Sequence, residues 1–501
     1  MNQPLRIVIA GGGTAGWMAA NLLAHRFAAI PIDIMLIESK DIGTIGVGEG
    51  STPTLKRFFQ TLDIAEHQWM PACHATYKVS IKFNGWSGDD NASYSHPFFS
   101  QLDVHSERSF YVNALTRRLG LDVETTPDRF FMGGYLAKKN LAPIPSHNFP
   151  FAIEYGYHFD SQKLSEFLKQ HAKQLGVEHI EGNIASVGTS VSGAISHLTC
   201  KDGQVLKGDF FIDCTGFSSL LLQKTLNVPF TSFNNNLFND SAVVLATPAI
   251  DHMPVETESS TMSNGWCWQI PLRNRTGNGY VYSQQYQDKD KAEYELRNKF
   301  NLLDSDVEAR HLTMRVGQCE QHWVKNCLAV GLSQGFIEPL EATALHLVQI
   351  TIEQFATYYA KGNYTEKYQQ HFNSDMTERF ERIRDYIVCH YKLNGRTDSQ
   401  YWMDNRENMQ LSESLLSLLD VWYRKGDIVQ EIKRQDIGKH FSAASWHCLL
   451  AGYRVFPQIA QHQPASLEEQ GDLFEENKLN TFFNRCSLNF EKQKTLFTSA
   501  V

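Results

Sequence analysis

The sequence lacks the features of secreted, membrane-spanning and nucleic-acid-binding proteins. Its apolar runs stay well short of the roughly 18–20 residues that a membrane span needs, and its first residues carry no signal-peptide pattern. The nine cysteines contain no C-x-x-C pair, so we expect neither a disulfide framework nor a metal site. The net charge of −9 argues against a nucleic-acid partner. We therefore expect a cytoplasmic protein with no metal ion and no membrane or nucleic-acid partner.

The first forty residues have the pattern of a dinucleotide-binding unit. A β-branched run, 6–10, stops at a glycine-rich turn that leads into helix-forming residues, and a second apolar run, 34–37, ends at Glu38. In this context the first glycine of G-x-G-x-x-G permits the turn, the second lets the backbone approach a pyrophosphate, and the third lets helix and strand pack. The acidic residue accepts a hydrogen bond from a ribose hydroxyl. The alternative interpretation is that the glycine-rich turn has a purely structural role. The cofactor-binding residues expected here are Gly11, Gly13, Thr14, Ala15, Gly16 and Glu38.

Two later strand-like runs end in the same way. Residues 210–216 and 327–331 each run from apolar residues to a glycine. Three strands whose carboxyl ends can face one crevice resemble the FAD-binding architecture of flavoprotein monooxygenases more than a nicotinamide dehydrogenase. The sequence has no second complete G-x-G-x-x-G for NADPH, so we expect reduced flavin to arrive from a separate reductase.

Four motifs resemble those of the flavin-dependent tryptophan halogenase family, in order and spacing along most of the chain. They are Gly46–Pro53, Tyr77–Phe83, Gly265–Pro271 and Phe336–Glu341. The W-x-W-x-I-P element is the family's own signature, although two tryptophans two residues apart also describe one face of a strand. In this sequence the signature consists of Trp266, Trp268, Ile270 and Pro271.

The resemblance implies a mechanism and assigns residues to it. FADH2 and O2 form a flavin hydroperoxide, a halide attacks it, and hypohalous acid travels to an aromatic substrate held elsewhere. Lys78 would activate the electrophile, either by hydrogen bonding or as a haloamine, and Glu341 would assist. Spacing alone cannot choose between Lys78 and Lys82, because an alternating strand would place both on one face. A solvated charge is the plain alternative for either lysine.

Further residues follow from the same resemblance. Gly48, Ser51 and Gly331 would contact FAD. Chloride or bromide would bind the backbone amides of Thr343 and Ala344, which open an apolar-periodic helix; helix amino termini bind anions. An ordinary capping role is the alternative for Thr343.

The substrate residues that the resemblance implies are aromatic. His96, Phe98 and Phe441 would stack on a flat ring. The tyrosines and the ammonium-binding glutamate that hold an amino acid in the family have no clear counterpart between Asp427 and Gln435. We therefore expect an indole-like arene, with free tryptophan or another electron-rich arene as the alternative.

The expected fold class is α/β, with a Rossmann-like FAD-binding module and an interleaved, mostly helical substrate module. We place the FAD-binding module at about 1–85 and 150–350 and the substrate module at about 86–149 and 351–501, where 367–391 and 412–424 have helical periodicity. The rival function is a flavin-dependent aromatic hydroxylase, and a flavin-binding protein without turnover is a third reading. The sequence leaves open a homodimer, the halide preference and the attacked carbon.

Overall fold

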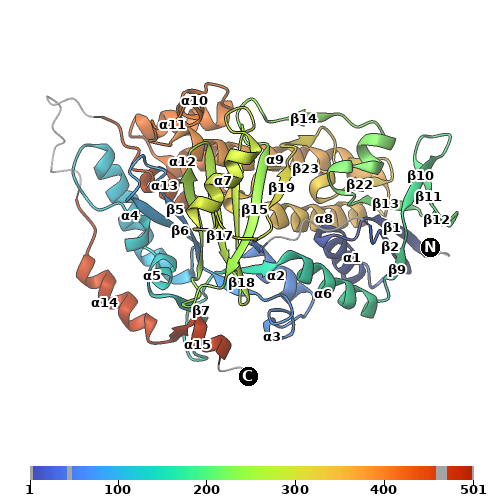
Figure 1. Cartoon of the computed structure of the whole chain (residues 1–501), viewed down its shortest axis with the longest axis horizontal. Helices are drawn as coiled ribbons and strands as arrows, with labels where there is room; N and C mark the ends of the chain where they lie inside the picture. Colours follow the sequence, from blue (N-terminus) through green and yellow to red (C-terminus); the bar gives the residue numbers. More distant parts are fainter. Residues whose placement is uncertain (1–3, 42–47, 459–470, 499–501) are drawn as a thin grey trace. The chain divides into compact units, whose positions relative to one another are not determined.

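A computed structural model describes residues 4–41, 48–458 and 471–498 (Figure 1). Gly46 and Val47, which begin the first family motif, lie outside the described residues. The contacts divide the chain into two compact units, each built from three segments. Unit 1 comprises Met1–Ala75, Phe159–Asn234 and Met314–Glu381, and unit 2 comprises Thr76–His158, Asn235–Thr313 and Arg382–Val501.

The two units interleave along the chain, but their bounds differ from the expected ones. Residues 235–313, which we expected in the FAD-binding module, are grouped with unit 2. The ranges expected for the substrate module are indeed mostly helical, and 235–313 adds strands to them. The function of each unit stays a prediction.

Unit 1 contains a mainly parallel six-stranded sheet in the order β21-β22-β13-β1-β2-β9. All neighbouring pairs are parallel except the edge pair β21 and β22. The three strands expected to end near one crevice, β1, β13 and β22, are neighbours in this sheet, so their carboxyl ends meet at one edge. The strands are β1 (Leu5–Ala10), β2 (Ile32–Glu38), β9 (Glu178–Glu181), β13 (Phe210–Asp213), β21 (Trp323–Val324) and β22 (Cys327–Ala329).

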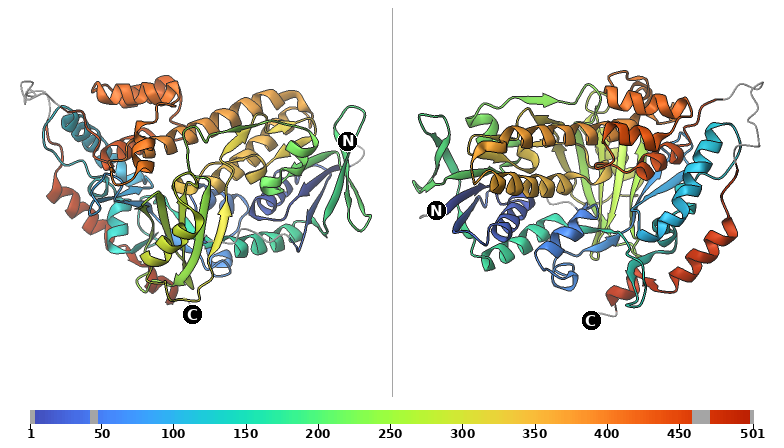
Figure 2. Two further views of the ribbon diagram at one scale, coloured as in Figure 1. Left: turned by 45° about the horizontal axis from the view of Figure 1, so that its top comes forward. Right: turned by 180° about the vertical axis from the view of Figure 1, so that it is seen from behind.

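Helices cover this sheet. Helix α1 packs against α6 and α8, and Asn21 of α1 donates to the carbonyl of Leu168 on α6 at 2.9 Å. Helices α8 and α9 run antiparallel and side by side (Figure 2), joined by the Tyr358 hydroxyl, which donates to Asp375 at 2.6 Å. The helices are α1 (Thr14–Arg26), α2 (Thr54–Thr61), α3 (Glu66–Trp69), α6 (Ser161–Gln174), α8 (Ala344–Lys361) and α9 (Gln369–Lys392), the last of which continues into unit 2.

Two smaller three-stranded sheets complete unit 1. They consist of β10 (Ile184–Thr189), β11 (Ile195–Cys200) and β12 (Val205–Lys207), and of β14 (Phe230–Ser232), β20 (Gly317–Cys319) and β23 (Gly335–Phe336).

Unit 2 is built on a seven-stranded sheet in the order β19-β15-β18-β17-β16-β5-β6. Its pairs are antiparallel except for β16 and β5. The signature tryptophans lie on β17. The strands are β5 (Ser80–Asn84), β6 (Ser93–Pro97), β15 (Ser241–Pro248), β16 (Glu256–Met262), β17 (Gly265–Pro271), β18 (Arg275–Tyr282) and β19 (Arg310–Thr313).

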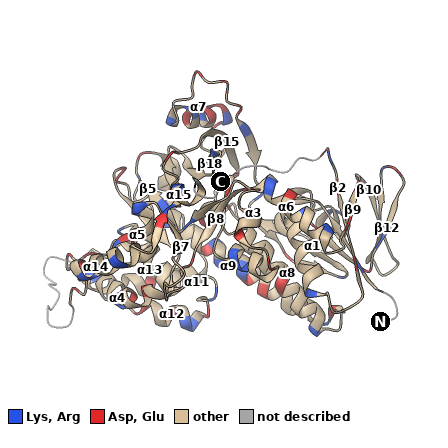
Figure 3. Ribbon diagram, turned by 90° about the horizontal axis from the view of Figure 1, so that it is seen from below, with Lys and Arg blue, Asp and Glu red and all other residues tan. Residues whose placement is uncertain are grey.

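Short strands and further helices complete unit 2, and Figure 3 shows basic and acidic residues interspersed along the helices of each unit. The expected helices at 367–391 and 412–424 are confirmed as α9 and α11. Strand β8 (Gly156–Asp160) begins in unit 2 and its last two residues are grouped with unit 1. The other elements are β4 (Thr76–Lys78), β7 (Leu141–Pro145), β24 (Phe490–Lys492), α4 (Val104–Arg118), α5 (Met132–Lys139), α7 (Lys289–Lys299), α10 (Gln400–Glu407), α11 (Glu413–Tyr423), α12 (Ile428–Gln435), α13 (Ala443–Gly452), α14 (Glu476–Ser487) and α15 (Gln493–Thr498).

Within the described residues, no helix combines the length and the apolar character that a membrane crossing requires. Nor do these residues include a group of three or more His, Cys, Asp or Glu side chains placed to hold a metal ion.

Candidate active site

The glycine-rich turn after β1 forms a cradle of exposed backbone in unit 1. Gly11 has φ +111°, and a Cβ there would overlap the carbonyl of Cys214 at the end of β13. The first backbone hydrogen bond of α1 runs from the amide of Trp17 to the carbonyl of Gly13 at 3.1 Å, so the amides of Thr14, Ala15 and Gly16 precede it. Amides at a helix amino terminus bind phosphate.

Glu38 lies directly over this turn. A Cβ on Gly12 would overlap the Glu38 carboxylate, so Gly12 is required here although we assigned it no role. Lys169 and His179 hold the same carboxylate at 2.5 and 2.9 Å. The close contact of Gly16 is with the carbonyl of Gly11, inside the turn, whereas we expected helix–strand packing to require this glycine.

The ends of the two neighbouring strands close the cradle. Gly331 follows β22 with φ +69°, and a Cβ there would stand 2.9 Å from that of Ala15. Asp213 at the end of β13 is fully buried and accepts from the amides of Leu221 and Leu222, so it closes its own turn. Positive-φ glycines, open helix amides and three adjacent strand ends together fit a dinucleotide such as FAD.

The second glycine motif adds a carboxyl group to unit 1. The Ser51 side chain is buried, and Gly48 begins the short strand β3 (Gly48–Gly50). Burial raises the pKa of Glu49 to about 7, with a smaller opposing effect from a hydrogen bond to Ser161 and a further rise from Asp160. The sequence analysis assigns Glu49 no role, and its position between two glycines is the signal that could have found it.

The segment that leads into α8 carries the predicted halide residues. Ala342 adopts a left-handed conformation, φ 54°, after the short turn Pro339–Glu341, and Ala344 is the first residue of α8. Thr343 makes no side-chain capping hydrogen bond, so the capping alternative is not what the structure shows. The Glu341 side chain is 7% exposed, and that of Glu338 is fully buried.

Lys78 lies at the end of β4 in unit 2 and is fully buried. Its Nζ stands 5.5 Å from the ring centroid of Phe98. The expectation that Lys78 and Lys82 share a strand face is wrong, because the alternation breaks at Val79, whose amide donates to the carbonyl of Val255 at 2.7 Å. Lys78 pairs with Gly156 of β8, whereas Lys82 lies on β5 in the seven-stranded sheet and is partly exposed.

A directed chain of hydrogen bonds lies beside Lys78. The Thr76 hydroxyl donates to the carbonyl of Pro271 at 2.7 Å, so its oxygen accepts from Nδ1 of His158 at 3.2 Å. Nε2 of His158 then accepts from the hydroxyl of Thr257 at 2.9 Å. Burial, with a contribution from the Lys78 charge, lowers the pKa of His158 well below 6.5. His158 is therefore neutral, and no motif in the sequence predicts its position.

The series of hydrogen bonds beside Lys78 ends at Pro271, the last residue of the signature motif. Pro271 closes β17, and the rings of Trp266 and Trp268 are both buried, with centroids 5.9 Å apart. The Trp268 ring occupies the position that a Cβ on Gly279 of β18 would fill. The motif thus packs the sheet and supplies, through Pro271, an acceptor for the strand that carries Lys78.

The predicted aromatic residues lie near one another in unit 2. His96 is 5% exposed, and its Nε2 lies 2.9 Å from the Ser445 hydroxyl. Phe441 stacks face to face on Tyr386, with centroids 3.7 Å apart. The Tyr386 hydroxyl lies 3.1 Å from that of Ser445, so Tyr386 connects His96 to Phe441. We predicted neither Tyr386 nor Ser445, which come from α9 and α13.

Comparisons with known proteins identify the family of this chain. The family model for tryptophan halogenase matches residues 6–469. Tryptophan 6-halogenase SttH of Streptomyces toxytricini is 33% identical over 93% of this chain and 94% of its own length. Tryptophan 7-halogenase RebH of Lentzea aerocolonigenes is 31% identical over 94% of each.

Solved structures give the same result. The crystal structure of SttH superposes with a TM-score of 0.83 and 30% identity over 99% of each chain. BrvH, a flavin-dependent halogenase from Brevundimonas sp. BAL3, superposes with a TM-score of 0.82 and 29% identity over 100% of each. The expected α/β fold class and the resemblance are thereby confirmed, and the hydroxylase alternative is not favoured. The chain belongs to the tryptophan halogenase family and is a flavin-dependent halogenase.

Proposed function

We propose that this chain chlorinates or brominates an indole-like arene, using FADH2 delivered by a separate reductase. The observation that carries the proposal is the fully buried Lys78 beside the Phe98 ring, because solvated lysines are the rule and a buried one needs a reason. When bound, reduced FAD supplies with O2 the oxidising equivalents that turn a halide into an electrophile.

The residues of this chain would then activate the electrophile, accept a proton from the ring and bind the halide. Lys78 donates a hydrogen bond to the hypohalous oxygen or forms a haloamine, and His158, whose pKa is lowered, adds no second positive charge beside it. Glu341 assists by receiving a proton from the attacked ring. The amides of Thr343 and Ala344, at the start of α8, hold the halide.

A product analysis tests the reaction. Indole, tryptophan, phenol and pyrrole are incubated with the chain, a flavin reductase, NADH, FAD, O2 and either bromide or chloride, and products are identified by mass spectrometry. We expect a halogenated indole whose yield requires the halide. Hydroxylated products formed equally without halide would contradict the proposal.

The substrate class is tested by competition. Aromatic side chains that could stack on a ring support the proposal, whereas an ammonium clamp is not recognisable in the sequence, so indole should react at least as well as tryptophan. Two missing charge-assisted hydrogen bonds of about 1.5–3 kcal/mol each would remove a preference of roughly a thousandfold. Equal concentrations of both are offered with bromide; products dominated by ring-brominated tryptophan would contradict this expectation.

A further inference from the structure

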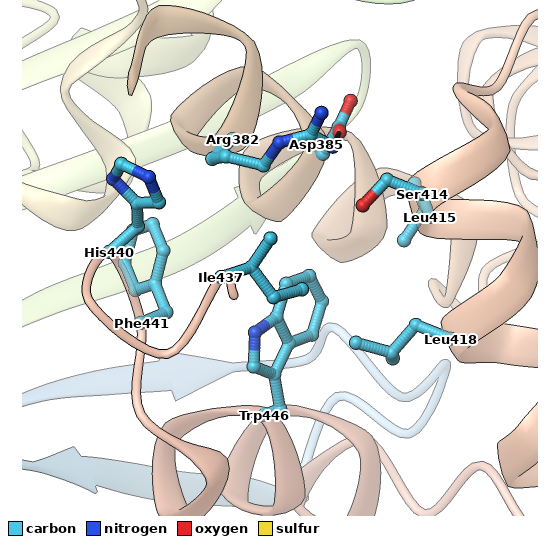
Figure 4. Close-up of a pocket in the computed structure, with 9 residues that line it drawn as sticks. All are labelled: Arg382, Asp385, Ser414, Leu415, Leu418, Ile437, His440, Phe441 and Trp446. Carbon is cyan, nitrogen blue, oxygen red and sulfur yellow. Dashed lines mark hydrogen bonds and ion pairs between the residues drawn. The ribbon is translucent and has the colours of Figure 1, made fainter. Parts of the chain in front are cut away.

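The cavity beside the predicted aromatic residues of unit 2 is too small for a substrate (Figure 4). Phe441 and Trp446 contribute to its wall, and its volume of about 10 Å³ accommodates one water-sized group, so a ring cannot enter it. The carboxyl-terminal segment of unit 2 has a clearer role, because it holds the backbone that carries Lys78.

The peptide groups on both sides of Lys78 are held by long-range hydrogen bonds. The amide of Val79, the following residue, donates to the carbonyl of Val255 at 2.7 Å. The amide of Tyr77, the preceding residue, donates to Oε1 of the Gln493 side chain, also at 2.7 Å. The lysine therefore lies between two fixed points, one in the segment that leads into β16 and one at the first residue of α15.

Gln493 joins these two points to each other. Its side chain is fully buried, and Nε2 donates to the carbonyls of Met253 at 3.1 Å and Pro254 at 3.0 Å, the two residues before Val255. The orientation of this side-chain amide is fixed, because the reverse orientation would place its oxygen against two carbonyls. The backbone amide of Gln493 donates to the carbonyl of Asn140 at 3.2 Å, which anchors the residue itself.

A second residue of α15 packs on the same tyrosine. Phe497 lies one helical turn after Gln493, and its ring stacks on the ring of Tyr77 with centroids 5.9 Å apart. The guanidinium of Arg273 lies 3.7 Å from the centroid of the Phe497 ring. Helix α15 thus contacts Tyr77 at its backbone and at its side chain.

We propose that Gln493 is a positioning residue for Lys78. This role rests on the proposed function, in which Lys78 activates the electrophile. A misplacement of a reacting group by about 1 Å can lower a rate about a hundredfold, so the backbone of an activating lysine has to be held firmly. Gln493 lies beyond residue 469, where the match to the family model ends, and no motif in the sequence predicts its contact with Tyr77.

Hydrogen–deuterium exchange of the full chain tests the contact without turnover. Gln493→Met keeps the approximate size of the side chain and removes its three hydrogen bonds, so the amide of Tyr77 loses its acceptor. We expect this amide to exchange at least about tenfold faster in the variant, while peptides from β1 and β13 of unit 1 keep their parental rates.

Asn394→Leu is the matched control. The Asn394 side chain is 1% exposed and has the same pattern of hydrogen bonds elsewhere in unit 2. It accepts from one backbone amide and donates to two backbone carbonyls, those of Arg396 (3.0 Å), Tyr391 (2.7 Å) and Trp402 (3.0 Å), respectively. This variant should lower the thermal midpoint about as much as Gln493→Met and leave the exchange of the Tyr77 amide at the parental rate.

Bromination measures the consequence for the reaction. The parent, Gln493→Met and Asn394→Leu each receive FADH2, O2, bromide and indole, and brominated product per oxidised flavin is quantified by mass spectrometry and absorbance. We expect the yield of Gln493→Met to be at least about tenfold lower than that of Asn394→Leu. FAD affinity and the rate of flavin oxidation should stay at the parental level in both variants.

Gln493→Glu is the conservative variant. Burial favours its neutral carboxyl group, which accepts from the Tyr77 amide and donates to only one of the two carbonyls. Its Tyr77 amide should exchange faster than in the parent and its yield should be lower, in both cases by less than in Gln493→Met. If Gln493→Met does not fold, the same two measurements on Gln493→Glu decide.

The outcomes separate the role of Gln493 from the proposed function. An unchanged exchange rate at Tyr77, or equal losses of yield in Gln493→Met and Asn394→Leu, overturns the positioning role even if the parent halogenates indole. A parent that halogenates no arene refutes the proposed function alone, and faster exchange confined to β4 in Gln493→Met then still supports Gln493 as the residue that holds the Lys78 backbone.

Discussion

At the scale of single residues, close contacts around the glycine-rich turn after β1 show which glycines the fold needs. The G-x-G-x-x-G pattern includes Gly11 and Gly16, each of which lies too close to a backbone carbonyl to carry a Cβ, but it treats Gly12 as a free position. In the structure the Glu38 carboxylate occupies the space where a Gly12 side chain would begin. A long-range contact of this kind depends on how β2 lies beside β1, which no local pattern contains.

Gly12→Ala should weaken FAD binding. The added Cβ displaces Glu38, so the hydrogen bond expected between Glu38 and the ribose is lost, which corresponds to a rise in Kd of about tenfold or more. Gly182→Ala is the matched control, because its Cβ would meet Ile37 at an ordinary 3.7 Å. Flavin fluorescence titration measures both, and equal affinities in the two variants would contradict the role of Gly12.

At the scale of elements, the sequence predicted the parts of the fold that depend on local pattern. The strands β1, β2, β13 and β22 and the helices α8, α9 and α11 all follow from apolar periodicity and glycine stops. The break between β4 and β5 could not be predicted from local pattern. It results from the hydrogen bond between the amide of Val79 and the carbonyl of Val255, which lies far along the chain. Helices α14 and α15 were also missed, since the polar tail shows only scattered apolar residues.

The residues of the candidate site likewise fall into those that a sequence motif predicts and those that only the structure reveals. Lys78 and Glu341 came from motif resemblance, whereas His158 and Tyr386 carry no motif and become visible only when distant segments meet. Their partners lie 82 and 59 residues away in sequence, respectively. Spacing within one element cannot reveal such contacts.

The link between β4 and β17 can be tested by Thr76→Val. Removing the hydroxyl leaves the His158 N–H and the Pro271 carbonyl without their buried partner, which should cost about 1–3 kcal/mol. The thermal midpoint, followed by circular dichroism, should therefore fall. Thr313→Val on the exposed end of β19 should change stability by less than about 0.5 kcal/mol, and an equal fall in both variants would contradict the link.

At the scale of the whole molecule, buried carboxyl groups should make stability depend on pH. Burial raises the pKa of Asp103 to about 7, although the amides of Ser100 and Met132 donate to it and lower the pKa in part. Burial likewise raises the pKa of Glu49 and of Asp128 to about 7. These groups hold protons in the folded state that the unfolded chain releases near pH 4.

The thermal midpoint should therefore fall as the pH rises from about 4 to about 7. In this window the folded state binds more protons than the unfolded state, so stability decreases with pH, by on the order of 4 kcal/mol for Asp103 alone. Asp103→Asn removes one titrating group and should flatten the curve while Glu49 and Asp128 keep part of it. A parental midpoint that rises through this window would contradict the assignment.

The proposed halogenation chemistry depends most on Lys78, whose role can be measured in one comparison of variants. Parent, Lys78→Ala and Lys82→Ala are each supplied with FADH2, O2, bromide and indole, and brominated product is quantified by mass spectrometry while flavin oxidation is followed by absorbance. We predict bromination by the parent and by Lys82→Ala, and none by Lys78→Ala, which should still bind FAD and oxidise reduced flavin. Bromination by Lys78→Ala at the parental level would contradict the account.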